Sequence, residues 1–259
     1  MQMIDLDQLT HHMGGLNPVE QRLTSSSKLI DLRPPEALID EVLTREGFAV
    51  LYGRWGTAKS FVALDWSLCI QGGLPWQGRE VHQGNVLYVV GEGLYGMSNR
   101  VRAWLQEFGP DETPEVDFHK GPVNLLRGQD VDYLVEAVKN RAIQLVVIDT
   151  LNRGLAGGDE NSSTHMGQVI MAVEKLQAQG SAVLVVHHVG WNGEFRGHSS
   201  VPGAADRMIR VNKAEDGTIW LKNTKSKDSA EFDPIPLHLK IVQLPWESSC
   251  VLTGNRWAA

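Results

Sequence analysis

The sequence predicts an α/β fold in which helices flank a mostly parallel central sheet, with antiparallel strands at its C-terminal edge. Short apolar runs rich in β-branched residues, bounded by glycines, recur at 49–52, 85–90, 145–149 and 182–188. Such runs are typical of strands that are buried on both faces of a parallel sheet. After residue 205, apolar and polar residues alternate instead, which is the pattern of half-exposed antiparallel strands.

The segments between these runs have the length and the endings of helices. We expect helices at 59–71, 97–109, 130–142 and 166–180, most of which stop at a glycine. We expect the antiparallel strands at 207–213, 218–225 and 236–244, with a hairpin turn at 215–217. Residues 1–30 are polar and weakly patterned, which predicts an N-terminal lead-in arm before one domain at 31–259.

Composition narrows the class of protein. Hydrophobic residues form 42% and charged residues 21% of the 259 residues, as in globular proteins with a full core. The chain has neither a membrane-length apolar run nor a secretory signal, and its only two cysteines are Cys69 and Cys250. These features predict a cytoplasmic protein without membrane contact. The net charge of −7 gives no support to DNA binding over the whole surface, so any DNA contact would use local loops or a channel between subunits.

Residues 53–60, GRWGTAKS, nearly match the phosphate-binding pattern G-x-x-x-x-G-K-(S/T). A predicted strand ends at Gly53 and a predicted helix begins at Lys59, which is the context that this motif requires. Backbone N–H groups would hold the phosphates of ATP, Lys59 would contact the same oxygens, and the Ser60 hydroxyl would bind Mg²⁺. The predicted ATP-binding residues are Gly53, Arg54, Trp55, Gly56, Thr57, Ala58, Lys59, Ser60 and Phe61. The alternative is a chance glycine-rich turn beside a lysine.

Ala58 stands where this pattern normally has a glycine. We expect the alanine to be tolerated if residue 58 has a negative φ, because alanine favours the helix that starts there. A position that needs a positive φ would accept alanine less readily. If residue 58 has a negative φ, we expect the site to bind and hydrolyse ATP.

Two carboxylates follow predicted buried strands. Asp149 ends the strand at 145–149, and Glu92 comes just after the strand at 85–90, between two glycines. The carboxyl ends of parallel strands meet at the edge of the sheet where ligands bind. We therefore predict that Asp149 is the second Mg²⁺ residue and that Glu92 is the catalytic base for the attacking water. The alternatives are a turn-capping aspartate and an ordinary surface glutamate.

His187 and His188 end the predicted strand at 182–188. Their spacing from His198 fits no zinc pattern, so a metal site is not favoured. We predict that His187 senses the γ-phosphate and passes its state to the following loop. A purely structural histidine is the alternative.

Six stretches, taken in order, resemble a known family. They are LYGRWGTAKSFVALD, GNVLYVVGEG, LVVIDTLNRG, VLVVHHVG, FRGHSSVPGAADRMIRV and KNTKSKD. Over residues 29–245 the chain is similar to the RecA-core ATPases of the plasmid RepA helicase type, which include phage-encoded relatives. The resemblance implies that 31–259 is a RecA-like ATPase domain that hydrolyses ATP with Mg²⁺. It also implies assembly into a ring, as a hexamer, or into a filament, with single-stranded DNA in a central channel.

The resemblance further implies that DNA contacts two loops, 152–164 and 189–203. In these loops Arg153 and Arg196 supply positive charge, and Trp191 and Phe195 are placed to stack on bases. For the two aromatic residues, an ordinary hydrophobic patch or a subunit contact is the alternative.

Lys225 and Lys227 lie in the last of the six stretches. In the family that the chain resembles, a basic pair at this place reaches the ATP of the adjacent subunit and assists hydrolysis. If the predicted strand continues through residue 227, both side chains project from the same face. The alternative is a solvated basic edge that discourages strand-to-strand aggregation.

These residues lead to one favoured function and two alternatives. The favoured function is a ring-forming DNA helicase of phage or mobile-element replication. A RecA-like ATPase of phage recombination or strand annealing would use the same site. A nucleotide-switched regulatory assembly with little turnover is the third possibility.

Overall fold

The computed structural model describes residues 24–31, 35–190, 193 and 195–255. The chain divides into two compact units, 1–35 and 36–259. The first contains the short helix α2 (Ser26–Leu29). The predicted arm at 1–30 lies largely outside the described residues, and its boundary stays a prediction. All elements below belong to the second unit.

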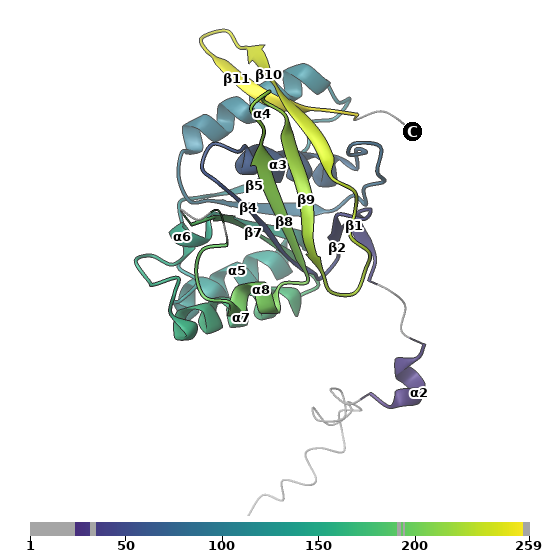
Figure 1. Ribbon diagram of the computed structural model, residues 1–259, viewed down its shortest axis with the longest axis vertical. Helices are drawn as coiled ribbons and strands as arrows, with labels where there is room; N and C mark the ends of the chain where they lie inside the picture. The colour runs from purple at the N-terminus through teal and green to yellow at the C-terminus, as the bar shows by residue number, and fades with distance from the viewer. Residues whose placement is uncertain (1–23, 32–34, 191–192, 194, 256–259) are drawn as a thin grey trace, which may run out of the picture. The chain divides into compact units, whose positions relative to one another are not determined.

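A nine-stranded sheet forms the centre of this unit in the described part of the chain (Figure 1). Its strand order is β11-β10-β9-β8-β3-β7-β6-β4-β5, and the strands from β8 to β5 in this order run parallel. The strands are β3 (Phe48–Gly53), β4 (Asn85–Val90), β5 (Asp117–Lys120), β6 (Ile143–Asp149), β7 (Ala182–His188), β8 (Arg207–Lys213), β9 (Ile219–Ser226), β10 (Ile235–Gln243) and β11 (Ser248–Thr253). The predicted mostly parallel sheet with antiparallel strands at its C-terminal edge is confirmed. The expectation that 207–213 is an antiparallel strand is wrong on one side, because β8 runs parallel to β3 and antiparallel only to β9.

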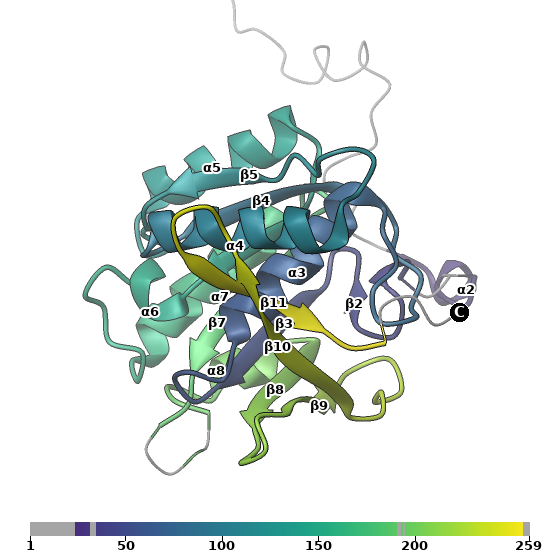
Figure 2. The ribbon, with the colours of Figure 1, turned by 90° about the horizontal axis from the view of Figure 1, so that it is seen from above.

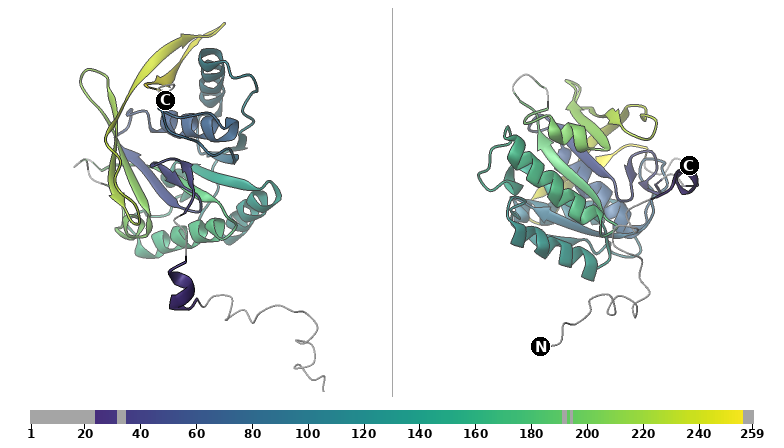
Figure 3. Two further views of the ribbon diagram at one scale, coloured as in Figure 1. Left: turned by 90° about the vertical axis from the view of Figure 1, so that its right-hand side faces the viewer. Right: turned by 90° about the horizontal axis from the view of Figure 1, so that it is seen from below.

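Helices cover both faces of the sheet (Figure 3). The helices α3 (Lys59–Gly72) and α4 (Leu94–Phe108) pack on one face. The opposite face carries α5 (Gly128–Asn140) and α7 (Ser163–Gln177), together with the short α6 (Leu151–Gly154) and α8 (Ser200–Ala204). Adjacent residues of β3 show why the strand must be apolar throughout: Val50 packs under α7 and Leu51 under α3. Each is fully buried.

The sequence pattern missed several short elements. The strand β5 reads DFHK, with a single large apolar residue, Phe118, so neither alternation nor a continuous run marks it. The strand β11, SSCVLT, pairs with β10 in an antiparallel hairpin. A two-stranded sheet of β1 (Ala37–Ile39) and β2 (Leu43–Thr44) was also missed. Strands this short depend on tertiary packing rather than on a sequence period.

Two sets of polar contacts fix α4 beside the carboxyl edge of the sheet. The buried carboxylate of Asp65 in α3 accepts hydrogen bonds from Trp76 Nε1 at 2.8 Å and from Trp104 Nε1 of α4 at 2.7 Å. The β10–β11 hairpin crosses α4 from outside (Figure 2), and Tyr95 Oη of α4 donates to Glu247 Oε1 at 2.7 Å. Both sets hold the helix that forms one wall of the site described next. Within the described residues, no helix has the length and apolar character that a membrane crossing needs.

Candidate nucleotide-binding site

The loop from β3 to α3 has the geometry of a phosphate-binding loop. A Cβ at Gly53 would lie 2.2 Å from the carbonyl oxygen of Val211 in β8, so only glycine allows the two strands to approach this closely. Gly56 has a φ of +78°, which glycine adopts without strain. The helix α3 begins directly after the loop, and its N-terminal N–H groups and dipole favour an anion there.

Lys59 is buried at the start of α3 and bonds the loop itself. Its Nζ donates to the carbonyl oxygen of Gly53 at 2.9 Å and to that of Arg54 at 2.8 Å. Burial lowers the pKa of the Lys59 ammonium to about 8, and the negative charge of Asp149 opposes this shift. The ammonium is therefore mainly protonated at neutral pH, and a phosphate could replace its carbonyl partners.

The backbone at Ala58 differs from the sequence expectation. Its φ is 70° and its ψ is 21°, which is the left-handed region, so the expected negative φ is wrong. The residue turns the chain from the loop into α3, and this turn is the reason that the pattern normally has glycine here. A Cβ in this region costs roughly 1–2 kcal/mol per residue. The Ala58 methyl group is buried in the core cluster under α3, which offsets part of that cost.

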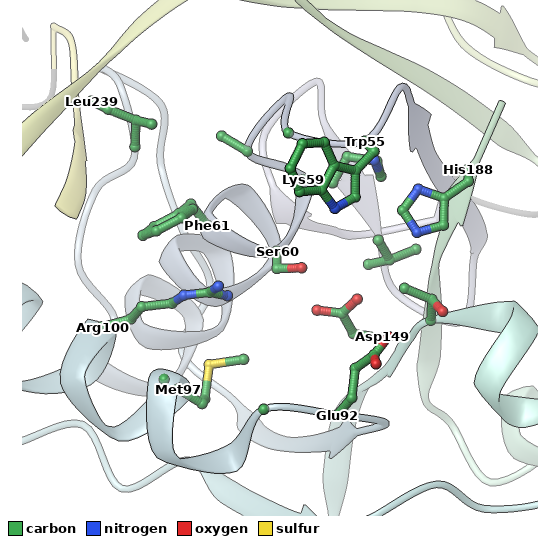
Figure 4. Close-up of a pocket in the computed structure, with 16 residues that line it drawn as sticks. Trp55, Lys59, Ser60, Phe61, Glu92, Met97, Arg100, Asp149, His188 and Leu239 are labelled. Carbon is green, nitrogen blue, oxygen red and sulfur yellow. The ribbon is translucent and has the colours of Figure 1, made fainter. Parts of the chain in front are cut away.

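The predicted metal residues lie in one pocket with the phosphate loop. Ser60 and Asp149 both line a cavity of about 460 Å³, a size in the range of small-molecule sites (Figure 4). Tyr88 Oη donates to Asp149 Oδ2 at 2.7 Å and so orients the buried carboxylate. A hydroxyl and a carboxylate are hard oxygen donors of the kind that Mg²⁺ prefers, so these residues fit the ion. Bound there, Mg²⁺ would neutralise charge on phosphate oxygens.

Glu92 lines the same pocket and is paired with an arginine. Arg153 Nη2 of α6 lies 2.8 Å from Glu92 Oε2, and both side chains are about half exposed. A Cβ at Gly91 would lie 2.7 Å from the carbonyl oxygen of Asp149 and 2.8 Å from Arg153 Cβ. Glycine at 91 therefore permits the close approach that brings Glu92 beside both residues.

The histidine that faces this pocket is His188, not His187. Successive residues of a strand point to opposite faces, and Val186 and His188 of β7 line the pocket. His187 points to the other face, where it is 1% exposed, contacts the Phe195 ring and donates from Nε2 to the carbonyl oxygen of Arg196 at 2.8 Å. The placement of His187 at the γ-phosphate is corrected accordingly. Burial also lowers the pKa of His188, with a further contribution from Lys59, so its ring is neutral at neutral pH.

Arg100 of α4 is a pocket residue that the sequence reasoning missed. Gly93, Gly96, Met97 and Arg100 all line the pocket, at the spacing of one helix face. The Arg100 guanidinium lies over the Phe61 ring, 4.4 Å from its centroid (Figure 4). Phe61, Met97 and Leu239 of β10 form the less polar end of the cavity, and Arg100 lies beside them (Figure 4). The i, i+3, i+4, i+7 spacing behind Glu92 was the available signal.

Arg54 is the loop residue that faces away from this pocket. Trp55 lines the nucleotide pocket and is 89% exposed, whereas Arg54 lines a second pocket next to the loop after β7. Thr57 Oγ1 donates to the Arg54 carbonyl oxygen at 2.8 Å. The predicted contribution of Arg54 to nucleotide binding is thus limited to its backbone.

The residues predicted to contact DNA differ in their exposure and in the side chains that they contact. Arg196 pairs with the buried Glu160, and its own side chain is 54% exposed. The Phe195 ring is partly buried against Tyr52 and His187, with a ring-centroid distance of 5.9 Å to Tyr52. Stacking of Phe195 on a base would require the loop to move. Trp191 lies outside the described residues.

Lys225 and Lys227 both have partners within the subunit. Lys225 Nζ donates to the carbonyl oxygens of Pro202 at 2.6 Å and Ala205 at 2.6 Å, at the C-terminal end of α8. Lys227 Nζ lies 3.6 Å from Asp206 Oδ1. The strand β9 ends at Ser226, so the assumption that the strand continues through residue 227 is wrong. A role of either lysine at a neighbouring subunit stays a prediction, and it requires these contacts to open.

Comparison with known proteins identifies the family. The AAA domain family matches residues 19–194, which is more than half of the chain. The chain belongs to this family. No curated protein matches it in sequence. Its fold is similar to that of a KaiC-like protein from the hyperthermophilic archaeon Pyrococcus horikoshii OT3, with a TM-score of 0.60 and 12% identity, covering 85% of this chain and 100% of that chain.

The family and the fold agree with the geometry of the pocket. An α/β core with a mostly parallel sheet carries a phosphate loop, a strand-end aspartate and a strand-end glutamate beside one cavity. Together they support a P-loop ATPase that binds and hydrolyses nucleotide.

Proposed function

We propose that this AAA-family protein is a Mg²⁺-dependent ATPase that is coupled to single-stranded DNA, as a ring-forming DNA helicase of phage or mobile-element replication. The observation that carries the proposal is the Glu92–Arg153 pair at 2.8 Å. It connects the carboxylate at the nucleotide pocket to the loop after β6, one of the two loops that the resemblance assigns to DNA. Occupancy of that loop by DNA would thereby reach the catalytic glutamate.

The residues of the nucleotide pocket have different parts in binding ATP. Lys59 and the N-terminal N–H groups of α3 hold the phosphates, while Ser60 and Asp149 are the residues that would hold Mg²⁺. Arg100 and Phe61, at the less polar end, are placed to contact the nucleoside. His188 offers a neutral ring at the edge of the same cavity.

Hydrolysis requires a proton acceptor for water. Glu92 takes the proton as the water oxygen bonds to the γ-phosphorus, the bond to the bridging oxygen breaks, and ADP leaves with inorganic phosphate as the second product. While Arg153 is paired with Glu92, the guanidinium occupies Oε2, one of the two carboxylate oxygens that could accept the proton of the attacking water. A DNA phosphate that competes for Arg153 would release Glu92, so DNA should stimulate turnover.

Steady-state ATPase assays with and without an oligothymidylate test the coupling. We expect single-stranded DNA to raise turnover several-fold, and duplex DNA of the same length to do so less. Turnover that is independent of DNA at every concentration would contradict the coupling and leave only the ATPase.

A forked duplex separates the helicase from the alternatives. A helicase should unwind the fork only with hydrolysable ATP, and the Lys59→Ala variant should be inactive because it lacks the phosphate-binding charge. Strand annealing without unwinding would instead support the recombination ATPase. Sizing of the protein with ATP and DNA distinguishes a closed ring from a filament.

A further inference from the structure

A second pocket lies on the outer side of the phosphate loop. This outer pocket, of about 610 Å³, is lined by Arg54, Trp55, Val189, Gly190 and Arg196. It therefore joins the loop after β3 to the loop after β7. Trp55 lines both this pocket and the nucleotide pocket.

Positive charge gathers at this pocket although the chain carries a net charge of −7. A Cβ at Gly193 would lie 3.5 Å from Arg210 Nη2 and 3.7 Å from Arg54 Nη2, so both guanidinium groups flank the same glycine. Arg210 does not itself line the outer pocket but is fixed beside Gly193, since its Nη2 donates to the Gly193 carbonyl oxygen at 2.8 Å and its Nε to Asn212 Oδ1 at 3.2 Å.

Two of the three arginines at or beside this pocket have no carboxylate partner among the described residues. In the described part of the chain, Arg54 and Arg210 form no ion pair, whereas Arg196 pairs with Glu160. Arginine presents several N–H donors in a rigid fork that matches phosphate oxygens. The outer pocket thus has the chemistry of a phosphate site with more than one arginine.

An exposed indole completes the set of groups. Trp55 is 89% exposed at the rim of the outer pocket. An apolar ring of this size gains by being covered, and its flat face suits a nucleobase. A groove with positive charge and an aromatic platform is the combination by which proteins bind single-stranded nucleic acid.

Hydrogen bonds connect the outer pocket to Lys59 of the nucleotide pocket. Lys59 Nζ and Thr57 Oγ1 both donate to the Arg54 carbonyl oxygen, at 2.8 Å each. A phosphate that replaced this oxygen as a partner of Lys59 would leave Thr57 as the remaining donor to it. The backbone that carries Arg54 and Trp55 would then be held differently with and without ATP, which would couple the two pockets reciprocally.

The geometry points to the outer pocket as a binding site for a phosphate and a base of a single DNA strand, with Arg54 and Arg210 at the phosphate and Trp55 against the base. This inference rests on the proposed function, because it names the residues by which the phosphate loop itself contacts DNA. The strand would then run between the phosphate loop and the loop after β7. ATP and DNA would occupy opposite sides of one loop.

Fluorescence anisotropy of a labelled oligothymidylate, measured over a range of salt concentrations, tests the site. Arg54→Gln and Arg210→Gln should each weaken binding and lower the salt slope by about 0.7, the value for one lost phosphate contact to a single strand. Trp55→Ala should weaken binding roughly tenfold with the salt slope retained, because stacking releases no counterion. Arg141→Gln, at the opposite edge of the sheet and 61% exposed, removes the same charge and should bind as the wild type.

Each other outcome has a definite meaning. Wild-type affinity and slope in both arginine variants, with weakened binding in Arg196→Ala, would overturn the inference and leave the proposed function intact. A wild-type protein that binds no single strand would overturn both. If Trp55→Ala instead abolishes self-association in sedimentation velocity and leaves DNA affinity unchanged, the indole covers a second copy of this chain and the inference fails.

The phosphate could also come from free nucleotide rather than from a strand. Competition by thymidine monophosphate and by inorganic phosphate separates these sources. A strand site should be displaced by oligothymidylate at far lower phosphate concentrations than by either small anion. Equal displacement by inorganic phosphate would show a simple anion site and overturn the inference.

Discussion

The two loops that follow β6 and β7 each carry an arginine held by a carboxylate, but the pairs differ in burial. Arg153 and Glu92 are 49% and 64% exposed. Arg196 is 54% exposed, whereas its partner Glu160 is only 5% exposed. An exposed pair is worth little and opens easily, while a buried carboxylate that loses its partner is strongly unfavourable.

The difference separates a switchable contact from a structural one. Glu92 faces the nucleotide pocket, where a change of partner alters chemistry. Glu160 belongs to the loop after β6 and binds the loop after β7, because its carbonyl oxygen accepts from His198 N at 2.8 Å and its carboxylate pairs with Arg196. His187 lies beneath, with Nε2 at 3.9 Å from Glu160 Oε2. The second pair thus holds the two loops together.

The largest effect should be a loss of ATP turnover that follows substitution of Glu92 but not of Glu160. Glu92→Gln should lower ATP turnover at least ~100-fold, the scale expected when a general base is lost, while nucleotide affinity persists. Glu160→Gln should change turnover only a few-fold but lower the midpoint of chemical denaturation. Steady-state ATPase assays and urea titrations of both variants check this. Wild-type turnover in Glu92→Gln would place the base elsewhere and remove the distinction.

Acid should destabilise the fold through His187, which lies beneath the second pair. Burial lowers the pKa of His187 from 6.5 to about 4, although the hydrogen bond to the Arg196 carbonyl oxygen opposes this shift; the positive charge of Arg196 acts in the same direction as burial. The unfolded chain then binds more protons than the folded chain between these values, so stability falls as the pH is lowered through this window, by up to about 3 kcal/mol. Unfolding free energies of wild type and His187→Gln, measured from pH 7 to pH 4, should diverge by this amount. Parallel curves would contradict the assignment of a buried neutral histidine.

A smaller effect should come from the exposed pair. Arg153→Ala frees Glu92, so basal turnover should rise a few-fold while stimulation by single-stranded DNA shrinks. Arg196→Ala is the matched variant: it should weaken DNA binding without raising basal turnover. Both are measured by ATPase assays with increasing oligothymidylate. If Arg153→Ala lowers basal turnover instead, the arginine assists catalysis and does not restrain Glu92.

The smallest effect should come from Ala58 in the phosphate loop, which belongs to neither pair. Ala58→Gly removes a left-handed alanine and should raise the unfolding free energy by about 1 kcal/mol, reduced by the loss of the buried methyl group. Turnover should stay within a few-fold, since no functional atom is removed. Thermal melts and ATPase assays check both. A gain in turnover of orders of magnitude would show that alanine had impaired the site.

The sequence by itself determined the parallel strands β3, β4, β6 and β7, the phosphate loop and the carboxylates at Asp149 and Glu92. These depend on local patterns: continuous β-branched runs, a glycine-rich turn between strand and helix, and polar residues directly after strands. Parallel strands bring such residues to one edge whatever the details of packing. The same reasoning predicted the antiparallel strands at 218–225 and 236–244. It did not show that 207–213, the strand β8, runs parallel to β3 on one side and antiparallel to β9 on the other.

Only the tertiary structure decided which side chains face the nucleotide. The run 187–188 offers two histidines, and the choice of His188 depends on which face of β7 meets α3. Arg100 enters the site because α4 is held over the pocket by Asp65 and by the β10–β11 hairpin. The partners of Arg153, Arg196 and Lys225 come from elements far away in sequence. Local patterns cannot fix such contacts, because they arise from the packing of whole layers.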